Sequence, residues 1–168
     1  MKIDLSSIFR SYDIRGVYPE QINAKVAYQI AQAYVKYVEP KGKIAVGRDV
    51  RISSPELQAA VIKGLIDAGI DIIDIGEVST DMYYFAVGHY RLAGGIQVTA
   101  SHNPAEYGGI KMVREEVYPL YGEKGIYQIR DLIFGLGLNV NRPEAGWPGD
   151  LARRAVSLED VAGAPLDL

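Results

Sequence analysis

The chain has 168 residues, of which 48% are hydrophobic and 23% are charged, and its formal net charge is -3. This composition is typical of a globular protein with its own core, and the lack of a basic block argues against nucleic acid as a partner. There is no cysteine, so disulfides and thiolate metal sites are excluded. The first residues lack the apolar stretch of a signal peptide, and no apolar run is long enough to span a membrane. We therefore expect a cytoplasmic protein with one domain and a tail.

The N-terminal segment 6–18 combines short apolar runs with residues that favour turns, among them Asp13. This pattern predicts an N-terminal hairpin with an exposed Arg15. From Asn23 onward, apolar residues recur at helical spacing until Pro40. A first helix, capped by Asn23, is therefore predicted.

A short apolar run at 43–47 predicts a buried strand. The polar segment after it carries Arg48, Asp49 and Arg51. We interpret these three residues as an ion-pair cluster that supports a cleft, in preference to direct ligand contacts. The pattern alone does not exclude ligand binding by either arginine.

The second helix is predicted to begin at Ser53 or Ser54 and to end at 68–69. Glu56 stands three residues after Ser53, so the two side chains could form a capping box. The isoleucine-rich run 70–76 follows, and its composition predicts a third strand, which is buried on both faces.

A third helix is predicted from Met82 to about Tyr90, with Ser79 or Thr80 as its cap. We assign its apolar side chains to the core and not to a binding platform. They are Met82, Tyr83, Phe85, Ala86 and Tyr90. His89, near the carboxyl end of this helix, is expected to be partly exposed.

The next strand, 95–99, leads directly into a loop that contains Ser101 and Pro104. Open α/β sheets bind their ligands at the carboxyl ends of parallel strands, and Ser101 stands at such an end. A returning strand is predicted over 109–113. Lys111 lies between two apolar residues of this strand, so alternation points it away from their face.

Three strand–helix units in succession imply right-handed crossovers and helices on both faces of a sheet. The predicted fold class is therefore α/β, a three-layer α/β/α arrangement with a mixed, mostly parallel sheet. A last helix is expected from about 123 to 135, which would close a domain over residues 1–135. Residues 136–168 contain repeated glycine and proline and are expected to form a flexible, linker-like tail.

The residues also suggest a serine hydrolase and a dinucleotide-binding site. Ser101 and His102 could form a hydrolase dyad, but neighbouring side chains in a loop usually project in different directions, and no Gly-x-Ser-x-Gly elbow is present. Glycines at 94, 95, 108 and 109 lack the Gly-x-Gly-x-x-Gly spacing of a dinucleotide site. Neither pattern favours a hydrolase or a dinucleotide-binding protein.

Four motifs together resemble the α-D-phosphohexomutases, the family of phosphomannomutase and phosphoglucomutase. The motifs are Tyr12-Asp13-Ile14-Arg15-Gly16, Gly47-Arg48-Asp49-Val50-Arg51-Ile52-Ser53-Ser54, Thr99-Ala100-Ser101-His102-Asn103-Pro104, and Tyr107-x-Gly109-x-Lys111. The resemblance covers residues 6–135, with a faint continuation to 161, and implies the first domain of such an enzyme. On this reading the segment near 156–161 is the approach to a second domain, and the chain is a truncated one.

The resemblance implies that Ser101 carries a phosphoryl group and that a phosphate oxygen on Ser101 binds Mg²⁺. It assigns Lys111 and Arg15 to proton transfer and charge, and His102 to shaping the site. Tyr12 and Asn103, together with Arg15 and Lys111, are implied to bind substrate or phosphate. The implied ligands are a hexose phosphate and a hexose 1,6-bisphosphate, with further metal ligands on mutase domains that this chain lacks.

Several alternatives remain at this point. A phosphoglucosamine mutase domain is the nearest one, although Ser79-Thr80-Asp81-Met82-Tyr83 favours the phosphomannomutase branch. The chain could instead be a non-catalytic structural or interaction domain, could assemble with a separate chain, or could form a homo-oligomer. One departure from the family is Gly108, where asparagine is usual, and the missing amide removes possible hydrogen bonds and loosens the loop backbone.

Overall fold

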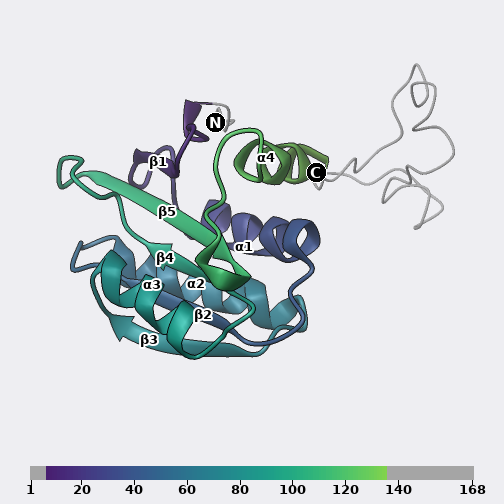
Figure 1. Ribbon diagram of the computed structural model, residues 1–168. Coiled ribbons are helices and arrows are strands. Elements are labelled where there is room, and N and C mark those ends of the chain that lie inside the picture. Colours follow the sequence, from purple (N-terminus) through teal and green to yellow (C-terminus); the bar gives the residue numbers. More distant parts are fainter. Residues whose placement is uncertain (1–6, 136–168) are drawn as a thin grey trace, which may run out of the picture. The chain divides into compact units, whose positions relative to one another are not determined.

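The structure is a computed structural model that describes residues 7–135 (Figure 1). These residues form a five-stranded sheet of order β1-β5-β4-β2-β3 with helices on both faces. The predicted linker-like tail, 136–168, lies outside the described residues. No helix of the described part is both long and apolar enough to cross a membrane.

The sheet is mixed, as predicted. Its strands are β1 (Ile14–Val17), β2 (Ile44–Arg48), β3 (Ile72–Glu77), β4 (Gly94–Val98) and β5 (Tyr107–Arg114). β2 pairs in parallel with β3 and β4, whereas β5 runs antiparallel to β4 and β1. The chain therefore reverses direction between β4 and β5, and the Ser101 loop lies at this reversal.

The helices are α1 (Ala24–Val38), α2 (Ser54–Asp67), α3 (Thr80–His89) and α4 (Ile126–Gly135), with a short 3₁₀ segment, η2, at Glu115–Val117. Two of the predicted caps are present. Val26 N donates to Asn23 Oδ1 at 3.1 Å, and Met82 N donates to Ser79 Oγ at 3.2 Å. Each bond satisfies one backbone N–H that the first turn of a helix leaves without a partner.

Strand alternation divides the apolar side chains between two cores. Ile96 and Val98 of β4 pack into the larger core, which also takes in residues of α1, α2 and α4. Ala45 of β2 and Val113 of β5 point to the opposite face, where they pack with Tyr83 of α3. The sheet thus separates a core under three helices from a smaller core under α3.

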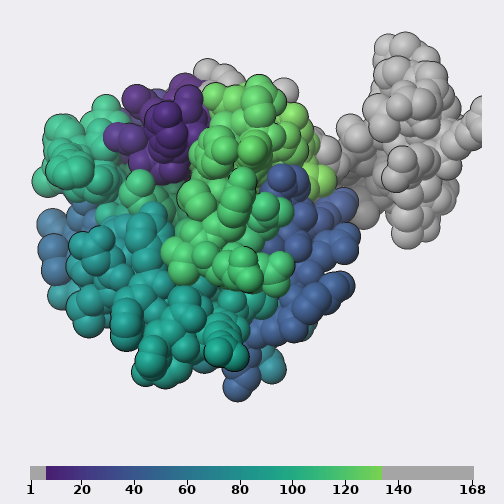
Figure 2. Space-filling view, in the orientation of Figure 1, coloured from purple at the N-terminus to yellow at the C-terminus, as the bar shows by residue number. Residues whose placement is uncertain are grey.

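The predicted N-terminal hairpin is present only in part. Phe9 and Ile14 form a single bridge, but the main partner of β1 is β5, with Ile14 opposite Ile110. Burial explains the difference, because Ile14 is fully buried and gains a place in the large core by pairing with β5. In Figure 2 the purple N-terminal segment lies against the green residues that follow β5, where Gly122 N donates to Ser11 O.

The assignment of all α3 side chains to the core was wrong for three of them. Tyr83 and Ala86 are buried, whereas Met82, Phe85 and Tyr90 are more than half exposed. α3 is apolar on more than one side, and its single sheet contact can cover only one of these sides. His89 is exposed as expected and stacks on Phe85, with ring centroids 4.9 Å apart.

Candidate functional site

Ser101 follows β4 in a backbone conformation that is unusual for a serine. Its φ is 54°, in the left-handed region that favours glycine. Ser101 N donates to Thr99 Oγ1 at 3.0 Å, and the Asn103 side-chain amide donates to Ala100 O at 2.7 Å. These bonds fold the loop tightly and leave the Ser101 side chain exposed.

The left-handed turn brings the side chains of Ser101 and His102 together. Ser101 Oγ and His102 Nδ1 lie 2.9 Å apart, a hydrogen bond whose donor depends on the imidazole tautomer. The expectation that the two neighbouring side chains point in different directions was therefore wrong. It applied to ordinary extended or loop backbone, and a positive φ at Ser101 changes the direction of the chain between them.

Lys111 faces the same side of the sheet as the loop. It is opposite Gln97 of β4, while its neighbours Ile110 and Met112 are buried in the large core, as alternation predicted. Lys111 Nζ lies 3.5 Å from Asp13 Oδ2. The second oxygen of Asp13 accepts from Arg15 Nε at 2.7 Å.

Asp13 is a residue that the sequence reading did not single out as part of the site. It is 3% exposed and joins the two cations. The Arg15 side chain is accordingly only 27% exposed, so the prediction of an exposed Arg15 was wrong. The tripeptide Asp13-Ile14-Arg15 offered a signal, since residues two apart in a strand share a face.

A pocket of about 830 Å³ opens in front of these groups. Among the predicted site residues, its lining includes Ser101, His102, Asn103 and Lys111. Arg15 does not line the pocket, but it shares the Asp13 carboxylate with the lining residue Lys111. The Tyr12 side chain is 75% exposed and does not line the pocket. The amino end of α3 also contributes, with Ser79, Thr80 and Asp81.

Tyr84 of α3 is another lining residue that the sequence reading missed. Burial, with the nearby carboxylates of Asp81 and Asp13, raises the pKa of its phenol. The hydroxyl therefore stays protonated at neutral pH and can donate a hydrogen bond into the pocket.

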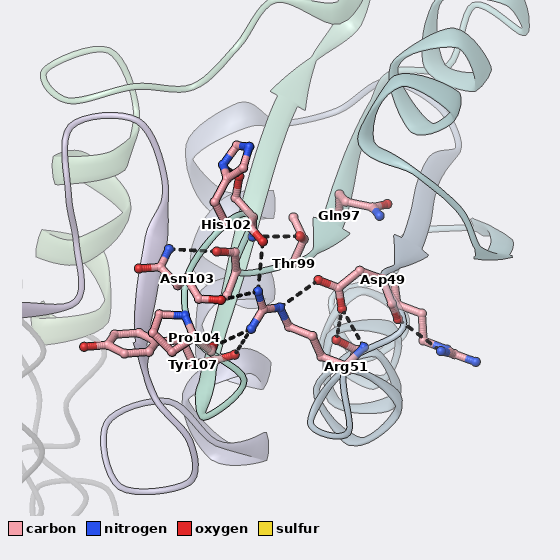
Figure 3. A network of polar contacts seen from close by, with 12 residues as sticks. Asp49, Arg51, Gln97, Thr99, His102, Asn103, Pro104 and Tyr107 are labelled. Carbon is pink, nitrogen blue, oxygen red and sulfur yellow. Dashed lines mark hydrogen bonds and ion pairs between the residues drawn. The ribbon is translucent and has the colours of Figure 1, made fainter.

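Arg51 reaches the serine loop from the turn after β2 (Figure 3). Its guanidinium pairs with Asp49 at 3.2 Å, so this part of the predicted ion-pair cluster is confirmed. The same guanidinium donates to main-chain oxygens of the loop. Arg48 pairs with Glu77 of β3 at 2.7 Å and donates to Asp49 O at 3.1 Å, and it makes no ion pair with the Asp49 carboxylate.

The sequence of residues 6–135 matches the family described as phosphoglucomutase/phosphomannomutase, alpha/beta/alpha domain I. The chain belongs to this family. A phosphomannomutase of Klebsiella pneumoniae is 48% identical over 124 residues, which cover 74% of this chain and 78% of that protein. A phosphomannomutase of Escherichia coli is also 48% identical over 124 residues, but there the match covers 27% of the relative.

Comparison with solved structures supports the same family. A solved structure of a phosphoglucomutase/phosphomannomutase family protein from Burkholderia thailandensis matches with a TM-score of 0.71 and 37% identity. The match covers 77% of this chain and 30% of that one. The chain therefore spans less than a third of several family members that it resembles, and corresponds to their domain I.

The family's usual asparagine is replaced by Gly108, and the structure shows where a side chain at this position would point. A Cβ on Gly108 would lie 2.9 Å from Leu57 Cδ1 and 3.1 Å from Ile22 Cγ2. Both atoms belong to the large core. Ser53 Oγ, which is buried without a partner, would be 3.5 Å away. The departure therefore affects packing beneath the loop and not the pocket surface.

The predicted capping box at the start of α2 was wrong. Ser53 is the cap by position but makes no side-chain capping bond. Ser54 Oγ donates instead to Asp49, and Glu56 accepts from Tyr18 Oη. A long-range partner, Tyr18, has taken the Glu56 side chain that the local motif would have used, and Ser53 Oγ is left without a partner.

Within the described residues, no three His, Cys, Asp or Glu side chains group together as a metal site. Mg²⁺ prefers six oxygen ligands in octahedral geometry. The side chains of the described residues therefore do not make up a complete magnesium site.

Proposed function

We propose that this chain is the phosphoserine-bearing domain of a phosphohexomutase that interconverts hexose 1-phosphate and hexose 6-phosphate. One observation carries the proposal. The Ser101 hydroxyl stands exposed at the pocket, 2.9 Å from His102 Nδ1, on the same side of the sheet as Lys111. A hydroxyl with a base at hydrogen-bond distance is an activated nucleophile.

The proposed step is transfer of one phosphoryl group from a hexose 1,6-bisphosphate to Ser101. A bond forms between Ser101 Oγ and phosphorus, and the bond between that phosphorus and the sugar oxygen breaks. The serine proton passes to His102 Nδ1, and the leaving sugar oxygen takes a proton from Lys111. In the reverse direction, phosphorylated Ser101 transfers the group to the free hydroxyl of a hexose monophosphate and regenerates the bisphosphate. Transfer of the phosphoryl group at the other position back to Ser101 then leaves the isomeric monophosphate and completes the interconversion.

Charge neutralisation is the main requirement of such a transfer. Lys111 is a cation in the pocket lining, and Arg15 adjoins it through Asp13. Asn103 lines the pocket as a polar contact, and the exposed Tyr12 is proposed to meet substrate beyond it. Mg²⁺, when bound, would supply further charge neutralisation, with a phosphate oxygen on Ser101 as the ligand from this domain.

The names of the relatives favour mannose phosphate among the substrates. Because the chain corresponds to 27% of the E. coli relative, we assign to it one side of the cleft. Sugar recognition and the other metal ligands would come from the remaining mutase domains, on the same or another polypeptide.

The test is the intact mass of the purified chain before and after incubation with glucose 1,6-bisphosphate. We expect a gain of one phosphoryl group in the wild type and no gain in Ser101→Ala. The matched control is Ser7→Ala, at the first described residue, which should gain the group as the wild type does. A gain that persists in Ser101→Ala would overturn the assignment of the acceptor, and no gain in the wild type would overturn acceptance by this domain alone.

A further inference from the structure

We propose that Arg51 is a positioning residue for the reactive serine, and that it acts by holding four main-chain carbonyls of the serine loop in one place. The proposal rests on the proposed function for its chemical meaning. The structural part of the proposal is that Arg51 holds residues 100–107 in a fixed shape, and this part does not depend on the proposed function.

The donors of Arg51 are fully used by the protein. A guanidinium has five N–H groups. Nε pairs with Asp49 Oδ2, Nη1 donates to Pro104 O at 2.6 Å and Tyr107 O at 3.2 Å, and Nη2 donates to Ser101 O at 2.8 Å and Asn103 O at 2.7 Å. Each of the five donors therefore has its own acceptor, and none is left for a phosphate oxygen.

The charge of Arg51 is also engaged. Asp49 pairs with it, and Asp49 is itself fixed because Oδ1 accepts from Arg51 N and from Ser54 Oγ. The Arg51 side chain is 14% exposed. A paired and largely buried guanidinium is suited to fixing a loop and poorly suited to capturing a soluble anion.

The loop needs such an anchor because Ser101 is held in an unfavourable conformation. A serine at a φ of 54° is destabilised relative to its ordinary conformations, and such a state persists only where surrounding bonds impose it. Arg51 holds the carbonyl of Ser101, Thr99 Oγ1 accepts from Ser101 N, and the Asn103 side chain holds Ala100 O. Figure 3 shows these bonds converging on the loop from two sides.

The consequence for chemistry is positional. The left-handed turn places Ser101 Oγ beside His102 Nδ1, and a relaxed backbone would separate the two side chains. Phosphoryl transfer depends strongly on the alignment of the attacking oxygen. Arg51 therefore contributes to the rate of transfer through the loop, without touching the sugar phosphate.

The experiment compares wild type with Arg51→Lys and Arg51→Gln, and uses Arg48→Lys as the matched control. Arg48 is the last residue of β2, pairs with Glu77 and donates to Asp49 O, but none of its bonds reaches the serine loop. Amide hydrogen exchange followed by mass spectrometry reports on 100–107 and on the sheet separately. The rate of phosphoryl uptake is measured over a range of glucose 1,6-bisphosphate concentrations.

For both Arg51 variants we expect exchange in 100–107 to rise about tenfold or more while exchange in the sheet is unchanged. The saturating uptake rate should fall about tenfold or more, with the half-saturating concentration within about twofold of wild type. Arg48→Lys should match wild type in both measurements.

Unchanged loop exchange in both Arg51 variants would overturn the proposal. So would exchange that rises equally in the sheet, because Arg51 would then stabilise the whole domain and not the loop. If wild type takes up no phosphoryl group, phosphoryl acceptance by this domain alone fails separately, and the exchange data still decide whether Arg51 fixes the loop.

Discussion

Asp13 shows how a single buried carboxylate can organise two cations at the edge of a pocket. One oxygen holds Arg15 and the other faces Lys111, so the orientation of both side chains depends on it. The side chains of Arg15 and Lys111 remain 27% and 21% exposed, and water therefore screens part of their interaction with Asp13.

We expect Asp13→Asn to lower the free energy of unfolding by about 1–2 kcal/mol, because two partly buried cations lose their counterion. Phosphoryl uptake by Ser101 should also slow, since Lys111 loses its support. Urea unfolding and the mass assay measure the two effects. Asp71→Asn, at an exposed position outside any ion pair of the described residues, is the control. Equal stabilities of Asp13→Asn and wild type would show that Asp13 organises nothing.

For individual residues, the sequence was informative about which side chains gather at the pocket, and less so about the bonds that hold them there. The alternation of apolar and polar residues around Lys111 was sufficient to predict which face of the sheet its side chain lies on. The contact of Ser101 with His102 could not be predicted, because the left-handed backbone depends on Arg51, a residue 50 positions away from the carbonyl it holds. Long-range bonds of this kind leave no local pattern.

Among the elements, α1 and α2 pack side by side and share a polar contact at their surface. Tyr28 Oη of α1 donates to Asp67 Oδ2 of α2 at 2.9 Å, and Lys63 pairs with the same carboxylate. The hydrogen bond from Lys63, followed by that from Tyr28, lowers the pKa of Asp67 below its ordinary value. The carboxylate is therefore favoured in the folded state over its protonated form.

A group whose pKa is lower in the folded chain adds stability above its unfolded pKa and loses it as the pH falls through the folded pKa. The stability that Asp67 supplies should thus be complete at pH 7 and decline below about pH 4. We expect the difference in unfolding free energy between wild type and Asp67→Asn to shrink between pH 5 and pH 3 (about one unit either side of that value). Urea titrations at both pH values measure it, with the exposed Glu20→Gln as control. A difference that is constant with pH would contradict the linkage.

Helices and their starts were the most predictable elements, because apolar spacing and the caps Asn23 and Ser79 act within a few residues of one another. The capping box at Ser53 failed for the opposite reason, since Tyr18, 38 residues away in the sequence, supplied a competing partner for Glu56. The exposed face of α3 also escaped prediction. Spacing shows that a helix is apolar, but not how many of its sides the rest of the molecule covers.

For the whole domain, the sheet joins two cores that share β4. Gly94 and Gly95 make this close packing feasible, since a Cβ on Gly94 would overlap Tyr34 from α1 and one on Gly95 would overlap Tyr83 from α3. Tyr34 Oη donates to Val113 O at 2.8 Å across the sheet. Neither helix could approach β4 so closely if the strand carried ordinary side chains there.

We expect Gly95→Ala to lower the free energy of unfolding by about 2 kcal/mol, because the added methyl would force α3 away from the sheet. Unfolding should remain a single transition, since both cores depend on β4. Near-UV and far-UV circular dichroism, followed together in urea, test this. Gly42→Ala is the control, because its methyl would lie 3.5 Å from Ala93 Cβ, an ordinary contact. Separate near-UV and far-UV midpoints would mean that the α3 core unfolds independently.

The order of strands was only partly accessible from the sequence. Successive strand–helix units predicted the parallel pairs, but β1 joining β5 depends on burial of Ile14 far from its sequence neighbours. The position of Ser101 just after a parallel strand was predicted from the apolar run 95–99, and the structure places it after β4 although β5 then reverses direction.

Because the chain reverses direction between β4 and β5, the length of the serine loop also determines which β5 side chains face the pocket. β5 is paired on both sides, so an inserted or deleted residue between Thr99 and Tyr107 could not be absorbed by sliding one free strand. A shift of β5 by one position would exchange its two faces, turning Lys111 into the large core and Ile110 toward the pocket. We therefore expect this loop to accept changed side chains far more readily than a gained or lost residue.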